Sequence, residues 1–538
     1  MQHLSSCFCL VAVLVQRVLA DAALVFDADD YNSGYYGANP NQTYYSSDIV
    51  SPLLQVNEWD KGRTDSDTIR VYQLLIPTPF SNAPYIFLAL ASPLGTESGP
   101  VILRADDLSL VYAEPKWPNA HNAHVGTLHG TDYLVFFEGV QRNGQWAGQC
   151  LIYDSSYELV HNITAKGINA SVDIHECQMT TSGSVLITVY QPIIYDLTPV
   201  GGPPNGELVD NIAQEIDVET GELLWTWRAS DHYDLADSYV KYKASPGGWD
   251  FFHMNSIDRS AEGNFLINSR HTHTVTYVDG STGDIIWTLG GKKNDFRDIS
   301  DGNALSFGWQ HHARFHDDDL TQVTFFDNHN VSTTPDCTVN CSRGLHLQLD
   351  FEDMTVQVVN EYFHPHSLVT GFMGSYQSTP NGNTLVGWGP NPTFTEYTPD
   401  GECVLDVQFD AWAPPSGGRG NYRAFKMDWK GFPSWEPSIA STAAGSALNG
   451  STGSNVFVSW NGATEVKSWQ LLRGGTPESV VSLSMLVSRA GFETKLAVKA
   501  GSRYVRALAL DAEGQVLGVT SIVDLRTNKA VPDPESVV

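Results

Sequence analysis

The sequence predicts an all-β protein: a six-bladed β-propeller followed by a small fibronectin type III or immunoglobulin-like β-sandwich. The main observation is a repeat in which a histidine heads successive strand-like segments, each running through a polar turn into a β-rich stretch. Repeats of tens of residues with about four strands each are typical of propellers. The histidines are His124, His175, His253 and His311, and a fifth copy carries Gln377 instead.

Turns of the form D-x-x-TG-x-x-x-W are the second signal for this fold. They occur in AQEIDVETGELLWTW and VTYVDGSTGDIIWTLG, where a glycine supplies the positive φ that a tight turn between antiparallel strands needs. Trp225 and Trp287 follow these glycines, and we expect them to pack between neighbouring blades.

The domain order follows from changes in composition along the chain. From about Tyr85, β-branched and aromatic runs become regular and make six units. A stretch rich in Ser, Ala and Gly then reads as a linker. Short alternating strands follow it, with Trp460 and Trp469 in the expected sandwich core. The predicted parts are a signal peptide (1–20), an N-terminal wrapping segment (21–84), the propeller (85–436), the linker (437–452) and the sandwich (453–526).

The N-terminus predicts entry into the secretory pathway. An apolar stretch of signal-peptide length ends in Val18-Leu19-Ala20, which is a small-residue cleavage signal. No later segment has the run of apolar residues that a membrane span needs. We therefore expect a secreted or lumenal, N-glycosylated protein of eukaryotic type. The glycosylation sequons are at Asn41, Asn162, Asn169, Asn330, Asn340 and Asn449.

The charge of the chain restricts which binding partners are expected. The chain has 31 Lys and Arg against 61 Asp and Glu, a net charge of −30. This field repels phosphate backbones and anionic lipid, so we expect no nucleic-acid or membrane partner. The simplest explanation of the acidic composition is that it keeps the protein soluble. The sequence leaves the oligomeric state open.

The cysteines favour structural disulfides over a metal site. Five remain after the predicted leader, so at least one thiol stays free or pairs between chains. Cys337 and Cys341 are close enough to clip one loop, and Cys150 could pair with Cys177. No second ligand pair has the spacing of a zinc site, so we expect no metal.

Several imidazoles and arginines are expected to converge on the propeller axis. On a strand that enters the axis with His253 inward, Asn255 would also point inward, because side chains alternate with period two. His253 and His311 stand at equivalent repeat positions, so a functional role is more expected for them than for a single core histidine. Arginines near the inner strands would match the oxygens of sulfate, phosphate or carboxylate, although pairing with the abundant carboxylates is an equal alternative. They are Arg343, Arg423, Arg270 and Arg314.

A set of local motifs resembles a known family. HMNSI, QHHARF, FDNHN followed by SRG, PNGNTLVGWG and NYRAF together resemble the arylsulfotransferase family in its fungal secreted branch, over roughly residues 80–435. Bacterial members are periplasmic six-bladed propellers that move a sulfuryl group between phenols through a transient sulfohistidine. The resemblance implies that His253 and His311 are the two axial histidines, Asn328 lines the pocket and Arg343 binds sulfate.

One position departs from the family pattern. The family's nucleophilic histidine should fall in the last blade, where this chain has Asn391, Thr393 and Asn421. A neutral amide cannot form the covalent intermediate. Either the double displacement is lost, or another imidazole has taken the role, the alternatives being His311, His312, His364 and His366.

These observations predict an arylsulfotransferase-like enzyme that needs no cofactor and acts on an aryl sulfate or a phenol. A second hypothesis keeps the pocket for non-covalent acid–base or pericyclic tailoring of a phenolic or quinone-like natural product. A third is a non-catalytic binding propeller. A quinoprotein dehydrogenase is disfavoured because eight blades and an adjacent cysteine pair would be expected. The predicted catalytic residues are His253, His311 and Arg343, and the predicted substrate-binding residues are His175, Asn255, His312, Asn328, Gln377 and Arg423.

Overall fold

The chain is built almost wholly from antiparallel β-sheets, with 50% strand and 4% helix. A computed structural model describes residues 24–33, 35–37, 39–57, 83–91, 99–329, 341–412, 420–441, 455–498 and 501–533. Within these ranges no helix has the length and apolar character to cross a membrane. The all-β class predicted from the sequence is thus confirmed. The predicted signal peptide lies outside the described residues.

The N-terminal segment contributes a strand to a distant sheet. It contains α2 (Ala28–Asn32), β1 (Asn41–Thr43), β2 (Val50–Pro52) and β3 (Gln55–Val56). β1 and β2 pair with each other, whereas β3 pairs with β28, the last strand of a sheet formed some 350 residues later. The segment therefore wraps onto the sheets that follow it.

The first sheet after this segment joins the two ends of the region. β4 lies between β5 on one side and the late strands β29 and β30 on the other, and β6 follows β5. The chain thus closes on itself through residues that are far apart in sequence. The strands are β4 (Tyr85–Ala91), β5 (Gly99–Arg104), β6 (Leu110–Ala113), β29 (Gly420–Asn421) and β30 (Phe425–Met427).

A nine-stranded sheet follows, in which two groups of four strands are linked by a single pair of residues between β9 and β11. The parallel strand β15 adds to β13. The groups are β7 (Ala120–Leu128), β8 (Thr131–Arg142), β9 (Gln145–Tyr153) and β10 (Leu159–Ile163), then β11 (Val172–Met179), β12 (Ser184–Tyr195), β13 (Gly206–Asp217), β14 (Leu223–Arg228) and β15 (Trp249–Asp250). Short 3-10 turns η3 (Thr198–Val200), η4 (Ala229–Asp231) and η5 (Leu235–Asp237) lie between them.

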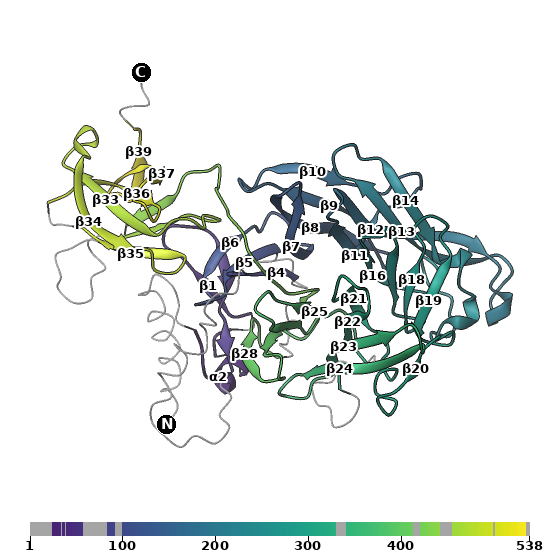
Figure 1. Ribbon diagram of the computed structural model, residues 1–538. Helices are drawn as coiled ribbons and strands as arrows, with labels where there is room; N and C mark the ends of the chain where they lie inside the picture. Colours follow the sequence, from purple (N-terminus) through teal and green to yellow (C-terminus); the bar gives the residue numbers. More distant parts are fainter. Residues whose placement is uncertain are drawn as a thin grey trace, which may run out of the picture.

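Three further sheets have four consecutive antiparallel strands each, and two of them gain a short extra strand. Figure 1 shows these sheets grouped with those of β7–β14, away from the C-terminal end of the molecule. They comprise β16 (Met254–Arg259), β17 (Phe265–Ser269), β18 (Thr274–Val278) and β19 (Ile285–Gly290); β20 (Arg297–Asp298), β21 (His311–Phe315), β22 (Gln322–Asp327), β23 (Arg343–Asp350) and β24 (Thr355–Phe363); and β25 (Ser375–Ser378), β26 (Thr384–Gly387), β27 (Thr393–Tyr397) and β28 (Cys403–Gln408).

These sheets pack against one another on both faces. Every residue of β17 and of β18 is buried, which requires cover on each side of the sheet. Trp225 of β14 stacks on Phe265 of β17 with ring centroids 3.7 Å apart, and Trp287 of β19 meets Phe296 before β20. Both tryptophans therefore pack between sheets, as the sequence predicted.

Hydrogen bonds also join residues of one group of strands to residues of the neighbouring group. The donor and acceptor pairs are Ile257 N to Glu176 Oε2, Ala313 N to Ser256 Oγ, Tyr376 N to His312 Nδ1, Ala424 N to Ser375 Oγ and Val125 N to Met427 Sδ.

The C-terminal part has two sheets that share one apolar core. Trp469 and Val505 of the larger sheet pack with Val456 and Leu496 of the smaller one. β31 lies inside the segment predicted as a linker, whose later residues lie outside the described part of the chain. The strands are β31 (Ser438–Ser441), β32 (Asn455–Ser459) and β35 (Glu493–Ala497), and β33 (Ser468–Gly474), β34 (Ser482–Ser488), β36 (Tyr504–Leu510), β37 (Val516–Val519), β38 (Ile522–Asp524) and β39 (Lys529–Val531), with the 3-10 turn η6 (Pro477–Ser479).

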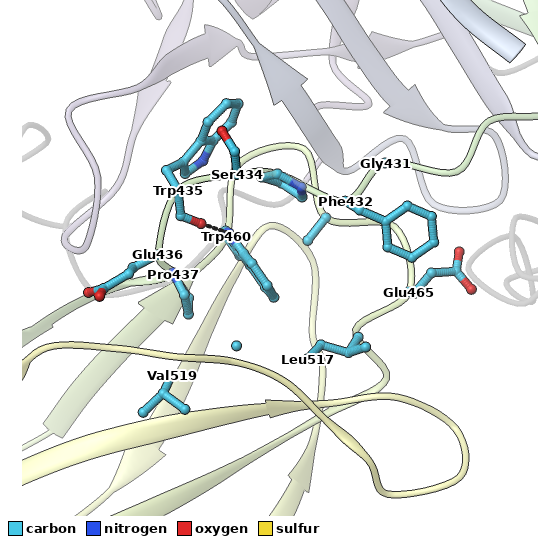
Figure 2. Close-up of a pocket in the computed structure, with 13 residues that line it drawn as sticks. Gly431, Phe432, Ser434, Trp435, Glu436, Pro437, Trp460, Glu465, Leu517 and Val519 are labelled. Carbon is cyan, nitrogen blue, oxygen red and sulfur yellow. Dashed lines mark hydrogen bonds between the residues drawn. The ribbon is translucent and has the colours of Figure 1, made fainter. Parts of the chain in front are cut away.

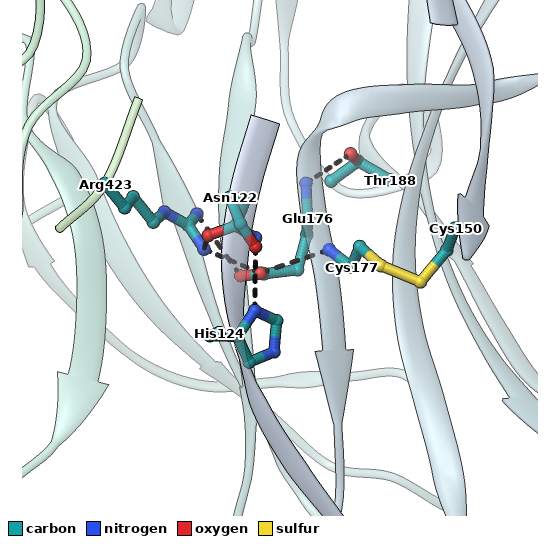
Figure 3. The surroundings of a disulfide bond; sticks show 7 residues. All are labelled: Asn122, His124, Cys150, Glu176, Cys177, Thr188 and Arg423. Atoms are coloured by element: carbon teal, nitrogen blue, oxygen red, sulfur yellow. Dashed lines mark hydrogen bonds and ion pairs between the residues drawn. A yellow bond between two sulfur atoms is a disulfide. The ribbon is translucent and has the colours of Figure 1, made fainter. Parts of the chain in front are cut away.

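One disulfide connects the two halves of the nine-stranded sheet. Cys150 of β9 is bonded to Cys177 of β11, which confirms that predicted pairing (Figure 3). Cys403 is free, and burial raises the pKa of its thiol to about 12. Cys341 is disulfide-bonded, but Cys337, its predicted partner, lies outside the described residues.

Candidate functional site

The first strands of several sheets are distorted where their histidines lie. The pairing register shifts between Met254 and Ser256 in β16 and between His311 and Arg314 in β21. His253 and His312 have left-handed backbones, with φ of 59° at each, which is uncommon for residues other than glycine. Bulges of this kind re-aim side chains and are frequent next to active sites.

Three imidazoles gather at one point. The ring of His253 lies edge-on to the ring of His175, with centroids 4.6 Å apart, and 4.5 Å from the ring of His271. Tyr190 stacks on His175 at 5.1 Å, and Tyr422 meets its edge at 5.8 Å. The structure therefore brings together His175 and His253, two residues that the repeat predicted to converge.

An aspartate orients each of these two histidines. Nδ1 of His253 is 2.5 Å from Asp250 Oδ2, and Nδ1 of His175 contacts Asp173 Oδ1. A carboxylate only accepts hydrogen bonds, so Nδ1 carries the proton and Nε2 keeps the lone pair. Neither Nε2 has a hydrogen-bond partner among the described residues, and the side chains are 21% and 11% exposed. Two oriented, unoccupied Nε2 atoms thus lie in one place.

The surroundings keep His253 neutral. Burial, followed by the charges of His175 and Arg270, lowers the pKa of His253 well below its usual range. Burial also lowers the pKa of His271 to about 3. A neutral imidazole can act as a nucleophile or a base near neutral pH.

Arg270 supplies positive charge beside this cluster. It lies in the tight turn between β17 and β18, which the backbone anchors through Arg270 N to His253 O at 3.0 Å. Its guanidinium donates to His271 Nε2 at 2.9 Å and to the carbonyl of Gly371 at 2.9 Å, while its buried Nε has no partner in the described structure. No described carboxylate forms an ion pair with it. Arg270 therefore keeps hydrogen-bonding capacity for an anion.

His311 and Asn328, both predicted for the site, are bonded to each other. His311 Nδ1 donates to Asn328 Oδ1 at 2.6 Å, and His311 Nε2 accepts from the backbone N–H of Met373 at 3.2 Å. Asn328 Nδ2 donates to the carbonyl of Thr370 at 2.7 Å. Both ring nitrogens of His311 are thus occupied, and in this arrangement the pair fixes the backbone around Met373.

Three other predicted residues make contacts between strands. His312 Nδ1 accepts from the N–H of Tyr376, and Gln377 exchanges hydrogen bonds with the backbone of Lys426. Asn255 is fully buried and donates to the carbonyl of Gln310 at 2.7 Å. The structure places these side chains in hydrogen bonds that hold neighbouring sheets together.

Arg343 is committed to partners away from the histidine cluster. Its Nε donates to Asp327 Oδ2 at 2.9 Å and its Nη1 to Glu361 Oε2 at 2.6 Å. Its Nη2 donates to the carbonyl of Asn303 and to Ser306 Oγ. Every nitrogen of this guanidinium has a partner, so sulfate binding by Arg343 would require an exchange of these contacts.

Arg423 ties three strands together from a fully buried position (Figure 3). It donates to Glu176 Oε1 at 2.7 Å and to the carbonyl oxygen of His175, both in β11. It also donates to Asn122 Oδ1 of β7 at 3.4 Å and to the carbonyl oxygen of Asn255 in β16. Arg314 donates to the other oxygen of Glu176 at 2.7 Å. Burial opposes the charge of Glu176, but the two arginines outweigh it and lower the pKa of Glu176 to about 2.

A family model describing arylsulfotransferase (ASST) matches residues 124–410, more than half of the chain. The protein belongs to the arylsulfotransferase family. The matched range begins at His124 and includes the whole histidine cluster.

Solved structures with weaker likeness come from bacteria. They are a protein of unknown function from Bacteroides caccae (12% identity, 64% of this chain and 98% of the other, TM-score 0.37) and a periplasmic gluconolactonase from Pseudomonas aeruginosa (12%, 64% and 97%, 0.29). A third is an inactive virginiamycin B lyase from Staphylococcus aureus with quinupristin (10%, 55% and 75%, 0.25). No curated protein matches.

The positions where this chain departs from the family motif have structural partners. Asn391 Nδ2 donates to Thr370 Oγ1, and Thr393 Oγ1 donates to Asp406 Oδ1. Asn421 Oδ1 accepts from the N–H of Ala89. The residue next to it, Tyr422, reaches the cluster through its ring contact with His175.

A metal site is compatible with the spacing of Asp250, His253 and His271, whose ligand atoms lie within 4.8 Å of one another. The environment argues against a cation there, because the guanidinium of Arg270 is bonded to His271. The positive charge of Arg270, in contact with one of the three candidate ligands, would repel a bound metal ion. The cluster suits an anion better.

The predicted site residues do not include Asp173, Asp250, His271 or Tyr422, whereas Arg270 is among the arginines expected near the inner strands. Two of them had a readable signal. Asp173-Ile-His175 and Asp250-Phe-Phe-His253 each place a carboxylate just before a repeat histidine. Tyr422 had no such signal, since only the chain closure through β29 and β30 brings it to the cluster.

Proposed function

We propose that this protein transfers a sulfuryl group from an aryl sulfate to a phenol, with the reaction at the cluster of His175, His253 and Arg270. The observation that carries the proposal is the pair of aspartate-oriented histidines beside an arginine that has no carboxylate partner in the described structure. Membership of the arylsulfotransferase family supports the reaction class.

In the first half-reaction His253 is the nucleophile. Its Nε2 lone pair forms a bond to sulfur, the bond from sulfur to the aryl oxygen breaks, and its electron pair leaves with the aryloxide. Asp250 holds the Nδ1 proton and stabilises the positive charge that develops on the ring. Arg270 neutralises the sulfuryl oxygens. Such electrostatic stabilisation is worth about 3–4 kcal/mol per donor.

In the second half-reaction His175 is the base. Its Nε2 takes the proton of the acceptor phenol, whose oxygen forms a bond to sulfur while the electron pair of the N–S bond returns to His253. Asp173 orients His175 for this step. The two rings, 4.6 Å apart, are close enough to serve one sulfur atom. In this assignment His253 takes the role that the family gives to a last-blade histidine. His311 and Asn328 then line the substrate pocket without reacting.

We also propose that the six groups of strands are blades of one propeller. The hydrogen bonds between neighbouring groups of strands and the pairing of β29 and β30 with β4 support a closed ring around Arg423. The two C-terminal sheets would be a fibronectin type III-like sandwich. The leader and the exposed sequons Asn162 and Asn169 support a secreted glycoprotein of the fungal branch.

The test is intact-mass spectrometry of the full-length protein after brief exposure to p-nitrophenyl sulfate. A covalent half-reaction adds about 80 Da, one SO₃ group, that a phenol then removes. We expect the adduct in the wild type and not in His253→Ala, while His129→Ala, at an exposed position, keeps it. Nitrophenolate release without any adduct, or an adduct that His253→Ala retains, would overturn His253 as nucleophile.

A second function is favoured by the same geometry. Two aspartate-oriented imidazoles whose Nε2 atoms have no described partner also suit acid–base tailoring of a phenolic or quinone-like compound with no covalent step. This alternative requires that the wild type neither releases nitrophenolate nor gains mass. Loss of turnover in both His175→Ala and His253→Ala with a phenolic substrate would then support it.

A further inference from the structure

A short segment before β25, residues 371–374, is bound to both halves of the candidate site. The carbonyl oxygen of Gly371 accepts from Arg270 Nη2 at 2.9 Å. Two residues later, the N–H of Met373 donates to His311 Nε2 at 3.2 Å, and its carbonyl oxygen accepts from Asn328 Nδ2 at 2.9 Å. The segment therefore links the arginine of the histidine cluster to the pair formed by His311 and Asn328.

The backbone of this segment is confined. Met373 has a left-handed backbone with φ of 59°, and Gly374 has φ of 108°. The N–H of Gly374 donates to the carbonyl oxygen of Tyr422 at 3.1 Å, and a Cβ at this glycine would lie 2.4 Å from the ring of Phe326. Strained conformations of this kind persist where the surroundings determine them, and they gather at sites that bind ligands. The segment is thus held in one position on the protein.

Phe372 is exposed although the segment that carries it is fixed. Its side chain is 41% exposed, whereas Gly371 and Gly374 are buried. Consecutive Cα atoms are about 3.8 Å apart, so Phe372 lies one residue from the contact with Arg270 and one residue from the contact with His311. An apolar ring on a fixed backbone loses less conformational freedom on binding a ligand than one on a free loop. Phe372 is therefore a preorganised contact surface beside the site.

The proposed reaction requires an apolar contact here. Arg270 neutralises the sulfuryl oxygens, and the aryl oxygen is bonded to the same sulfur, so the aryl ring begins two bonds from the atom that the sulfuryl oxygens surround. The ring of Trp309 is already covered by the guanidinium of Arg270, which lies 5.0 Å from its centroid. Contact between two aromatic rings adds to the effect of burial, on the order of two- to tenfold in affinity. Phe372 is placed to distinguish an aryl group from an alkyl group.

We propose that Phe372 contacts the aryl group of the sulfate donor and selects for aromatic substrates, and that His311 and Asn328 position it by holding residue 373. The inference rests on the proposed function, because Arg270 places the sulfuryl group. An alkyl sulfate would keep the contact with Arg270 and lose the contact with the ring. His311 and Asn328 then act on substrate choice through the backbone, without taking part in the reaction.

The probe is 2-naphthalenesulfonate, whose carbon–sulfur bond offers no aryloxide leaving group, so that binding is measured apart from turnover. Isothermal titration calorimetry on the full-length protein compares it with benzenesulfonate. We expect Phe372→Ala to weaken binding of 2-naphthalenesulfonate about fivefold and to reduce the preference for the larger ring. Phe372→Tyr keeps the ring and should bind as the wild type does. Tm should not change in either variant, because the side chain is exposed.

Phe432→Ala is the matched control. Phe432 is 49% exposed and, with Trp435 and Trp460, lines a groove of about 280 Å³ beside the C-terminal sheets (Figure 2). Every residue that lines this groove follows residue 410, where the family match ends. Binding of 2-naphthalenesulfonate should be unchanged in this variant. Weaker binding in Phe432→Ala, with binding retained in Phe372→Ala, would overturn the proposal, since the groove would then hold the aryl group.

Asn328→Ala tests the positioning role. Loss of its donor to Met373 should weaken binding of 2-naphthalenesulfonate as Phe372→Ala does. The double variant should bind no more weakly than either single variant, because both changes remove the same contact. Additive losses would show that Asn328 acts independently of Phe372 and would contradict the positioning. If Asn328→Ala does not fold, Phe372→Ala and Phe372→Tyr still decide the contact.

Turnover of p-nitrophenyl sulfate is measured in parallel, so that two failures can be told apart. Binding that depends on Phe372 without nitrophenolate release would contradict the proposed function alone. Nitrophenolate release with equal binding of 2-naphthalenesulfonate to the wild type and to Phe372→Ala would contradict this inference alone. Absence of binding to the wild type at millimolar concentration would contradict the inference as well.

Discussion

Arg423 and Arg270 are two arginines near the same histidines, and their surroundings differ in one respect. Arg423 is fully buried against the carboxylate of Glu176 and two backbone carbonyls. Arg270 contacts a histidine and one carbonyl, and has no described carboxylate partner. A buried guanidinium whose charge is already balanced holds the fold together, whereas one with spare donors can bind an anion.

The largest expected effect is on stability, at Arg423. Arg423→Ala leaves Glu176 charged and buried beside Arg314 alone, and breaking a buried pair in this way costs about 3–5 kcal/mol. We expect a large drop in Tm and in soluble yield. Thermal unfolding monitored by circular dichroism measures it. A variant with wild-type Tm would show that Arg423 does not hold the three strands together.

Arg270→Ala should separate activity from folding. Removal of a donor that stabilises transition-state charge is expected to lower kcat/KM for an aryl sulfate about 10²–10³-fold. Because no described carboxylate forms an ion pair with Arg270, its removal leaves no buried charge unpaired, and Tm should change far less than in Arg423→Ala. Steady-state kinetics and thermal unfolding on the same preparation make the comparison. A low Tm with normal kcat/KM in Arg270→Ala would instead show that Arg270 stabilises the fold and does not act in the reaction.

Asp250→Asn tests the orientation of the nucleophile. The amide can donate to Nδ1, which would move the proton to Nε2 and remove the lone pair from the reacting atom. We expect kcat to fall roughly 10²-fold, as for loss of a general catalyst, with a small change in KM. Asp210→Asn is a control, since that carboxylate pairs with Arg228 outside the cluster. Unchanged kcat would remove Asp250 from the mechanism.

The smallest effect is the pH dependence of stability. The pKa of His271 falls from about 6.5 to about 3 on folding, so the unfolded chain binds more protons between these values. Stability is therefore fully present above pH 6.5 and falls with decreasing pH, by at most about 1.4 kcal/mol per pH unit for this group. The pKa of the Glu176 carboxyl falls from 4.5 to about 2 on folding, so its contribution to stability is lost mainly below pH 5.

Urea unfolding at pH 7 and pH 5 measures this dependence. His271→Gln should reduce the loss of stability on acidification, whereas His161→Gln, at a position remote from the cluster, should not. An equal loss in wild type and His271→Gln would show that other buried histidines, such as His121 and His124 with pKa lowered to about 4 by burial, carry the effect.

Much of the fold could be predicted because it is written in local patterns. Alternating apolar runs, glycine turns and the repeat itself indicated antiparallel sheets, and the Cys150–Cys177 pairing was correct. The addition of β3 to the sheet of β25–β28 left a weaker trace, since a two-residue strand has almost no pattern of its own.

The site was predicted only in part. The repeat position correctly singled out His175 and His253 as neighbours, because equivalent positions of successive sheets converge. The resemblance to the family pointed to Arg343, whose nitrogens are bonded to Asp327, Glu361, Asn303 and Ser306. Whether Arg343 binds sulfate stays a prediction.

The sequence by itself determined the all-β class, the family and the histidines that recur at strand heads. Only the tertiary structure decided which of their nitrogens remain unoccupied. Local sequence sets what hydrogen bonds a side chain is able to make. The partners that occupy these hydrogen-bonding groups, such as Asn328 for His311 or Glu176 for Arg423, come from other parts of the chain.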